Sequence, residues 1–191
     1  ALGDGQYTFR ARVTDAAGNE ATSSDATVTV DTTPPAAPAI TGITEDTGAS
    51  DSDGVTTDQT LVLSGTAEAN STVDVYEGGS LLGTSAADLS GAWSYDHTGT
   101  ALNEGAHSFT ATASDAVGNV SPVSVAFHVT VDATPPTSRV QALPQTSASR
   151  SFPIYVTGED PTTGSAPASG LDHFEIFVSI DQGPFAYWTT V

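Results

Sequence analysis

Apolar and polar residues alternate along separate stretches of the chain. The odd-numbered residues of 7–13 are Tyr, Phe, Ala and Val, and Thr or Arg stands between them. The same alternation returns over residues 107–113 and, after a short turn, over residues 125–131. A period of two places every second side chain on one face, so each stretch predicts a half-buried β-strand. The last two stretches together predict a hairpin.

These stretches belong to a long internal repeat. Residues 4–35 reappear, with substitutions, as residues 104–136. The offset is 100 residues from Asp15 to Asp115 and 101 from Asp31 to Asp132, which implies one inserted residue in the second copy. Both copies end in two prolines, which end a strand and stiffen the segment that follows. A period of this length matches one small β-sandwich domain.

Three further short strands are predicted between the copies, at residues 61–65, 71–77 and 80–85. Gly78-Gly79 fits a tight two-residue turn between the last two. Trp93 and Tyr95 share one face of another short strand, and we expect them in the core. The sequence therefore predicts an all-β fold class of tandem immunoglobulin-like β-sandwich domains, with partial domains at both ends.

The predicted boundaries divide the chain into three parts. Residues 1–33 supply the C-terminal strands of a preceding immunoglobulin-like domain, residues 34–133 form a complete domain, and residues 134–191 begin a different one. A domain without half of its strands has open edges and an unfilled core. We therefore expect both ends of the chain to be poorly supported.

Four motifs mark the central unit from Pro38 to Pro136. They are ITEDTG (43–48), LVLSGTAEANSTVDVYEGGSLLGT (61–84), SDAVGNVS (114–121) and VDATPP (131–136). As a set they resemble the bacterial immunoglobulin-like repeats of large type I secreted, RTX-type adhesins. The last part of the chain, with SFPIYVTGED (151–160) and PFAYW (184–188), resembles the start of a fibronectin type III module.

The resemblance implies a structural extender, or stalk, of a large secreted or surface-attached bacterial adhesin. In that family the repeats lie between a membrane-side anchor and a distal binding tip, and calcium binds at the domain junctions. The implied partners are the neighbouring immunoglobulin-like domains of the same chain. The implied localisation is secreted or at the cell surface.

Charge limits the other partners. The 191 residues include 23 Asp and Glu but only 4 Lys and Arg, which gives a formal net charge of −19. Nucleic acids and anionic membrane surfaces are bound by clusters of Lys and Arg, so the composition excludes nucleic acid and disfavours membrane surfaces. No stretch reaches the ~20 apolar residues of a membrane span, which argues against membrane insertion. The absence of Cys excludes disulfides and cysteine-ligated zinc.

Acidic side chains concentrate in the loops that a seven-strand sandwich brings to its two ends. At the first domain junction, strand direction gathers Asp4, Asp31, Glu68, Asn70, Asp115 and Asn119. At the second junction it gathers Glu45, Asp46, Asp51, Asp53, Asp58, Glu104 and Asp132, facing Glu159 and Asp160. Two carboxylates about 5 Å apart repel by roughly 0.8 kcal/mol in water and about 3 kcal/mol at an effective dielectric constant of ~20. The loop over residues 45–58 therefore favours a bound cation.

Calcium suits such a loop, because Ca²⁺ accepts roughly six to eight oxygen ligands in irregular geometry, main-chain carbonyls included. All of the residues named at the two junctions except Asn70 and Glu104 are predicted metal ligands. Asp51 starts a stretch that begins like an EF-hand loop, but Val55 and Val62 stand where oxygen ligands are required. The ligands are therefore expected to come from several segments. The alternative is a flexible acidic loop that binds no metal.

Motifs of the common enzyme classes are missing. The sequence has no nucleophile elbow, no zinc-protease motif, no phosphate loop and no dinucleotide fingerprint, so we predict a non-enzyme without a small-molecule substrate. Tyr7, and His107 aligned with it, stand near strand starts, as the corner tyrosine of sandwich domains does. We expect a structural role for both.

One alternative function stays open, a carbohydrate- or host-binding module of a cell-surface protein or of a polysaccharide-degrading enzyme. Such modules use exposed aromatic side chains. The candidates in this chain are Tyr76, Trp93, Tyr95, Tyr187 and Trp188.

Overall fold

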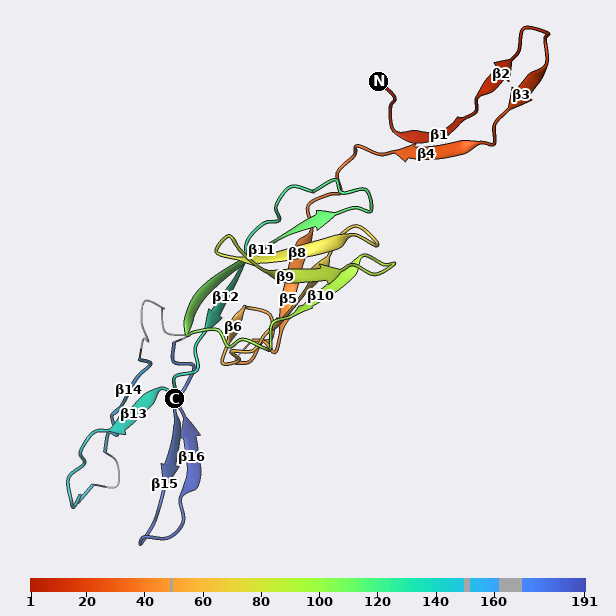
Figure 1. Ribbon diagram of the computed structural model, residues 1–191. Coiled ribbons are helices and arrows are strands. Elements are labelled where there is room, and N and C mark those ends of the chain that lie inside the picture. The colour runs from red at the N-terminus through yellow and green to blue at the C-terminus, as the bar shows by residue number, and fades with distance from the viewer. Residues whose placement is uncertain (49, 150–151, 162–169) are drawn as a thin grey trace. The chain divides into compact units, whose positions relative to one another are not determined.

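The computed structural model describes residues 1–48, 50–149, 152–161 and 170–191. Every regular element in these residues is a β-strand, which confirms the predicted all-β class (Figure 1). The described residues accordingly hold no helix that could span a membrane. Parts of the predicted C-terminal module, at residues 150–151 and 162–169, lie outside the described residues.

The described residues contain sixteen strands. The first eight are β1 (Gly5–Phe9), β2 (Arg12–Thr14), β3 (Glu20–Thr22), β4 (Ala26–Val30), β5 (Ala39–Thr44), β6 (Val55–Thr56), β7 (Val62–Thr66) and β8 (Thr72–Glu77). The others are β9 (Ser80–Ala86), β10 (Ala92–Asp96), β11 (Gly105–Ser114), β12 (Phe127–Val131), β13 (Thr137–Val140), β14 (Val156–Glu159), β15 (Glu175–Val178) and β16 (Ala186–Thr190).

Two larger sheets form the middle of the chain. One has the strand order β10-β7-β5, and the other has the order β6-β12-β11-β8-β9. The end segments form two-stranded sheets, namely β1-β4, β2-β3, β13-β14 and β15-β16. The predicted hairpin is present as β11 and β12, which pair antiparallel from Gly105 with Val131 to Phe109 with Phe127. Strand β6, in contrast, pairs parallel with β12.

The chain folds into two compact units whose segments alternate along the sequence. The first comprises Ala1–Ile40, Gly65–Ser94 and Thr110–Val125, and the second comprises Thr41–Ser64, Tyr95–Phe109 and Ala126–Val191. Strands β5, β7, β10 and β11 each have residues in both units.

Alternate positions of the strands fill the core of the first unit. The buried apolar side chains there are Val73 and Val75 of β8, Ala87, Trp93 of β10, and Ala111 and Ala113 of β11. Trp93 is only 4% exposed, which confirms its predicted place in the core. Gly65 of β7 leaves room for this ring, because a Cβ atom there would lie 2.6 Å from Trp93 Cζ2. Tyr95, also expected in the core, is only partly buried.

The second unit has a core of the same kind. Its buried apolar side chains are Leu61 just before β7, Leu63 in β7, Leu102, Phe109 of β11, and Val129 and Val131 of β12. Phe109 is among the largest of the fully buried side chains. On β11 the predicted apolar face is confirmed, because Phe109, Ala111 and Ala113 are all fully buried. The predicted outward face is itself partly buried, since Thr112 is only 8% exposed.

The first copy of the repeat lacks this burial. Phe9 is 52% and Val13 is 66% exposed, although their alternation predicts a buried face. Strands β1–β4 pair only with one another in two-stranded sheets, so in the described residues no second sheet covers these side chains. The apolar face that the alternation predicts for the first copy is therefore exposed in the described structure.

Serine side chains replace part of the strand ladder beside β11. Ser121 Oγ accepts a hydrogen bond from Ala113 N at 2.9 Å, and Ser124 Oγ accepts one from Ala111 N at 2.9 Å. In the first copy, Ser23 Oγ accepts the matching bond from Ala11 N at 3.0 Å. Ala11 and Ala111 are offset by 100 residues but Ser23 and Ser124 by 101, so the inserted residue lies just before Ser124.

The second strand of the hairpin is consequently shorter than predicted. It begins at Phe127, whereas the alternation predicts a start at Val125. Val125 is instead 88% exposed. Ser124 uses its own N–H and its hydroxyl on Ala111, so the regular ladder starts only after this residue.

Substitution of Gly65 tests the close packing of β7. A Cβ atom at this position would lie 2.0 Å from Ala39 O and 2.6 Å from Trp93, so we expect Gly65→Ala to destabilise the chain by about 1–3 kcal/mol. Gly42→Ala is the matched control, because the nearest atom to its added Cβ lies at 3.9 Å. Urea unfolding followed by tryptophan fluorescence measures both. Equal midpoints for the two variants would contradict the packing described here.

Candidate functional site

A tight turn closed by an aspartate follows β11. Asp115 Oδ1 accepts hydrogen bonds from the main-chain N–H groups of Val117, Gly118 and Asn119 at 2.8–2.9 Å. Asp115 Oδ2 accepts a bond from Asn119 Nδ2 at 2.7 Å. Gly118 has a φ of 95°, which a residue with a Cβ atom rarely adopts. The turn therefore satisfies both carboxylate oxygens and fixes the orientation of the Asn119 amide.

The first copy of the repeat builds the same turn. Asp15 Oδ1 accepts bonds from Ala17 N and Asn19 N, and Asp15 Oδ2 accepts one from Asn19 Nδ2 at 2.8 Å. The hydrogen bond from the Asn19 side chain is the main cause that lowers the pKa of Asp15. In the second copy, burial works to raise the pKa of Asp115, but the bonds from Asn119 and the main chain outweigh it and lower that pKa.

The segment that leaves each copy is tied back by a carboxylate. In the first copy, Asp4 Oδ1 accepts bonds from Thr32 N and Thr32 Oγ1, and Asp4 Oδ2 accepts one from Thr33 Oγ1 at 2.7 Å. These threonines lower the pKa of Asp4. Asp31 Oδ1 accepts a further bond from Thr33 N. Pro34-Pro35 follows directly.

The second copy repeats this arrangement. Both carboxylate oxygens of Glu104 lie 2.8 Å from Thr134 Oγ1, whose single hydroxyl proton they share, and Asp132 Oδ1 accepts a bond from Thr134 N at 3.3 Å. Glu104 aligns with Asp4 and Asp132 with Asp31. We call each of these two sets of residues an exit clamp. The first exit clamp consists of Asp4, Asp31, Thr32 and Thr33, and the second of Glu104, Asp132 and Thr134.

One hydrogen bond joins the turn to the first exit clamp. Asn119 Nδ2 donates to the main-chain oxygen of Asp31 at 3.1 Å. Asp31 and Asn119 are 88 residues apart in the sequence, and both belong to the first compact unit. Two residues of the predicted first junction therefore meet, through an amide donor and a carbonyl oxygen.

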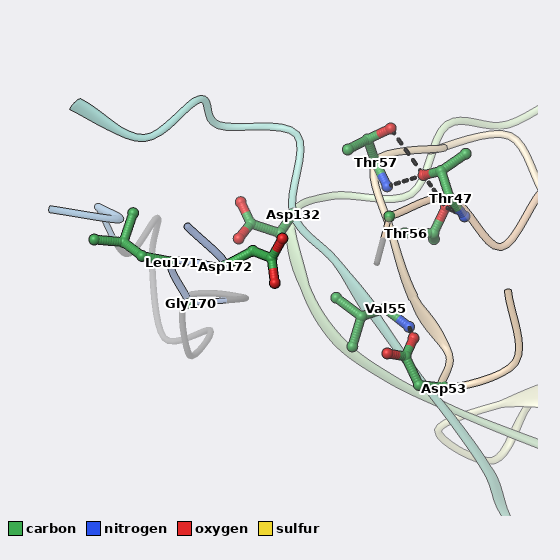
Figure 2. A pocket seen from close by; sticks show the side chains of 10 residues that line it. Thr47, Asp53, Val55, Thr56, Thr57, Asp132, Gly170, Leu171 and Asp172 are labelled. Carbon is green, nitrogen blue, oxygen red and sulfur yellow. Dashed lines mark hydrogen bonds between the residues drawn. The ribbon is translucent and has the colours of Figure 1, made fainter. Parts of the chain in front are cut away.

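The acidic loop over residues 45–58 is organised around a buried threonine. Thr56 Oγ1 donates to Glu45 O at 2.7 Å and accepts a bond from Asp58 N at 3.0 Å. Asp58 in turn accepts bonds from Glu45 N and from the main chain and side chain of Thr60. Burial works to raise the pKa of Asp58, and these bonds lower it. Figure 2 shows the pocket that Thr47, Asp53, Val55, Thr56, Thr57 and Asp132 line.

Asp46 differs from its neighbours in this loop. Its Oδ2 accepts a bond from Gly54 N at 3.0 Å, whereas its Oδ1 is buried without a hydrogen-bond partner. A buried carboxylate oxygen without a partner is costly, because it has lost water and gained nothing in exchange. Asp46 Oδ1 is thus an available acceptor for a donor or a cation.

The remaining predicted ligands show fewer contacts. Asp53 accepts a bond from Val55 N, Asp160 accepts one from Gly170 N, and Asp51 is exposed. Glu68 and Glu159 take part through their main-chain oxygens, which accept bonds from Ser71 and Thr137 respectively. Across the described residues, no group of three or more His, Asp or Glu side chains is arranged to hold a metal ion.

Sequence reasoning identified the acids but missed their partners. Thr32, Thr33, Thr134 and Thr56 receive or donate the bonds that position the acidic side chains. The repeat held the signal for two of them, Thr33 and Thr134, because Thr precedes Pro-Pro in both copies, whereas Thr32 aligns with Ala133. Thr56 carried no such signal, since its role depends on a loop that is not repeated.

Two expectations about aromatic rings can be compared with the structure. Tyr7 donates from its hydroxyl to Gly3 O at 2.8 Å, and His107 Nε2 lies 2.8 Å from Asn103 O, which confirms the structural role of this aligned pair. Of the carbohydrate-platform candidates, Tyr187 and Trp188 on β16 are 57% and 55% exposed, whereas Trp93 is buried. Phe177 contacts the edge of Tyr187, with 6.0 Å between the ring centres.

Comparisons with known proteins agree with this architecture. A family model described as bacterial Ig-like domain matches residues 1–32 and 35–133. The chain is 34% identical over 158 residues to Exoglucanase B of Cellulomonas fimi. That match covers 80% of this chain and 13% of the exoglucanase, so the chain spans a small part of that relative.

Solved structures of similar proteins show weaker likenesses. The tetra-tandem repeat in the extending region of a large adhesion protein is 23% identical, with a TM-score of 0.42 over 100% of this chain and 46% of that one. Fibronectin(III)-like modules of Clostridium thermocellum CbhA are 18% identical, with a TM-score of 0.38 over 68% and 64%. A structure from a 1.5-MDa bacterial ice-binding adhesin is 28% identical, with a TM-score of 0.32 over 66% and 41%.

The aspartate turn predicts a defined dependence of stability on pH. Because the pKa of Asp115 is lowered in the folded chain, its contribution is present above the ordinary aspartate pKa of 3.8 and is lost as the pH falls through the lower folded value. We expect the melting temperature to fall more steeply below pH 3.8 in the parent than in Asp115→Asn, which keeps an acceptor oxygen but takes up no proton. Thermal melts between pH 7 and pH 2.5 measure this. If the melting temperatures of the parent and of Asp115→Asn fall in parallel with pH, Asp115 does not contribute to the pH dependence of stability.

Proposed function

Because the chain belongs to the bacterial Ig-like domain family, we propose that it is a structural extender, a stalk segment of a large secreted or surface-attached bacterial adhesin. The observation that carries the proposal is the exit clamp. Asp4 with Thr32 and Thr33, and Glu104 with Thr134, tie down the segment that leaves each copy of the repeat. A module that serves only to connect needs a fixed exit more than it needs a binding pocket.

Physical properties of the exit support this role. Each clamp lies directly before Pro-Pro, which has a fixed φ and lacks N–H donors. Carboxylate bonds to the preceding threonines restrict the few remaining rotations, and proline-rich linkers act as semi-rigid spacers. Together they favour transmission of direction from one module to the next. The partners in this proposal are the neighbouring immunoglobulin-like modules of the same polypeptide, outside the cell or on its surface.

A domain exchange tests the extender role. In the full-length protein, we expect adhesion to be kept when a foreign β-sandwich of equal length replaces residues 34–133. We expect adhesion to weaken when these residues are deleted, because the stalk is then shorter. Adhesion of cells to the natural surface measures both. If the foreign domain fails to restore adhesion that the deletion abolishes, the segment has a binding role of its own and is more than a spacer.

The 34% identity to part of Exoglucanase B favours a second candidate, an accessory module of a polysaccharide-degrading enzyme. The exposed rings of Tyr187 and Trp188, on opposite faces of β16, would then be the candidate contacts to the polymer. Retention of the chain on insoluble cellulose, lost on Tyr187→Ala with Trp188→Ala and unaffected by a chelator, would favour this candidate over the extender.

We propose further that calcium binds to the acidic loop and stiffens the junction that follows it. The buried Asp46 Oδ1 without a partner supports this, since it is an acceptor in a loop with five carboxylates. Asp46 and its neighbours Asp53 and Asp58 would supply side-chain oxygens. Main-chain carbonyls and water would complete the shell, because Ca²⁺ accepts all three kinds of ligand. The ion would supply charge neutralisation and cross-linking.

Removal of calcium tests this second part of the proposal. Binding to the folded state alone stabilises by about 2.7 kcal/mol at roughly one hundred times Kd, so excess chelator is expected to lower the melting temperature. Asp46→Asn is expected to abolish most of that response. Asp74→Asn, on β8 and outside the predicted ligands, is the control. An unchanged melt of the parent in chelator would exclude a stabilising calcium site.

A further inference from the structure

The turn at Asp115–Asn119 holds an amide group in a fixed orientation. Asn119 N donates to Asp115 Oδ1 at 2.9 Å, and Asn119 Nδ2 donates to Asp115 Oδ2 at 2.7 Å. Main-chain bonds from Asp115 N to Asn119 O and from Gly118 N to Asp115 O close the loop. A side-chain amide has two N–H donors, so one remains for a partner outside the turn. Its direction is set before any partner arrives.

The partner of that donor is a main-chain oxygen in the exit segment of the preceding copy. Asn119 Nδ2 donates to Asp31 O at 3.1 Å. Asp31 is the first residue after β4, which ends at Val30, so its carbonyl lies outside the β1–β4 ladder. The side chain of Asp31 is itself turned to Thr33 N within the exit clamp. The contact therefore joins two segments that are each already ordered by their own bonds.

The two copies share the donor. Asn19 Nδ2 is held by Asp15 Oδ2 at 2.8 Å, as Asn119 is held by Asp115. Gly18 and Gly118 have similar φ values, 88° and 95°, and the same two main-chain hydrogen bonds close both turns. Within the described residues, the Asn19 amide donates to Asp15. Of the two amides, only that of Asn119 also donates to a carbonyl oxygen of an exit segment.

We propose that this turn is a docking site for the exit segment of a preceding bacterial Ig-like module. The side-chain amide of Asn119 holds that exit segment. The ligand it takes is the main-chain carbonyl of the acidic residue that ends such a module. Asn19 presents the same donor to an exit segment of the same kind. This holding contact is an amide-to-carbonyl hydrogen bond and works without a metal ion. The inference deepens the proposed extender role, but it is tested by geometry and not by adhesion, so either can fail alone.

The proposal makes a prediction that separates it from metal binding by Asn119. Asn119→Asp keeps an oxygen ligand and adds a charge that a calcium site would favour, but it removes the amide donor. Asn119→Ala removes both. For a docking donor, the two substitutions should have the same effect. For a calcium ligand, Asn119→Asp should behave like the parent when calcium is present.

Distance measurements between spin labels provide the test. The chain has no Cys, so Thr8→Cys and Ser80→Cys introduce two unique labelling positions, both exposed, in the full chain. A hydrogen bond contributes a factor of about two to ten to an equilibrium, so the population in the narrow distance peak should fall by that factor relative to the undocked population. We expect this loss in Asn119→Ala and Asn119→Asp, with calcium or with chelator. Asn19→Ala is the matched control and should keep the parent peak.

Three results would overturn the proposal. They are an unchanged peak in Asn119→Ala, a parent-like peak of Asn119→Asp in calcium alone, and a parent without a narrow peak under either condition. If the Asn119 variants fail to fold, hydrogen exchange in the parent decides the matter. Both Nδ2 protons of Asn119 should exchange about two- to tenfold more slowly than the faster Nδ2 proton of Asn19. Equal rates for the faster proton of each amide would also refute it.

Discussion

The constraint on which this structure depends is the near absence of positive charge. With 23 acidic and 4 basic side chains, the chain cannot neutralise its carboxylates through ion pairs. The ion pairs of Arg10 with Asp25 and of Arg12 with Glu20 use half of the arginines, at exposed positions where such pairs contribute little. Many of the other carboxylates accept hydrogen bonds from N–H and hydroxyl groups of their own chain. Asp88 and Asp96, for example, accept bonds from the residue two positions further on, which lowers the pKa of each.

That constraint links local sequence to the arrangement of the exits. An aspartate beside Thr, Ser or Gly finds its donors within a few residues, so each acidic loop is ordered on its own. Asp4 and Glu104 are exceptions, because they reach threonines 28 to 30 residues further along the chain. In these two places the hydrogen bonds from the threonines to the carboxylate close a long loop and fix the segment before Pro-Pro. Asp46, with one buried oxygen still unsatisfied, is where the local solution is incomplete.

The strands could be predicted from the sequence to a large extent, whereas the acidic loops could not. Alternation over residues 107–113 identified a face that is buried at Phe109, Ala111 and Ala113, because the period of two is imposed by the backbone. Loops have no such period. The two-residue strand β6 pairs parallel with β12 through contacts that no local pattern encodes. Strand direction placed Asp31 and Asn119 at the same junction, and the structure joins them by a hydrogen bond from the Asn119 amide to the Asp31 carbonyl. Their role as metal ligands stays a prediction, because spacing alone does not distinguish a carbonyl acceptor from a cation.

The short parallel pairing of β6 with β12 has a mechanical consequence. Thr130 N donates to Gly54 O at 2.7 Å and Asp132 N donates to Thr56 O at 2.9 Å, immediately before the clamp at Thr134. Tension applied to the chain beyond Thr134 pulls β12 along its own axis, so these bonds are loaded together in shear. An antiparallel hairpin pulled at its open end would instead lose its bonds one at a time. The exit strand β12 is thus held in a shear geometry, in which resistance to force grows with the number of hydrogen bonds that must break at once.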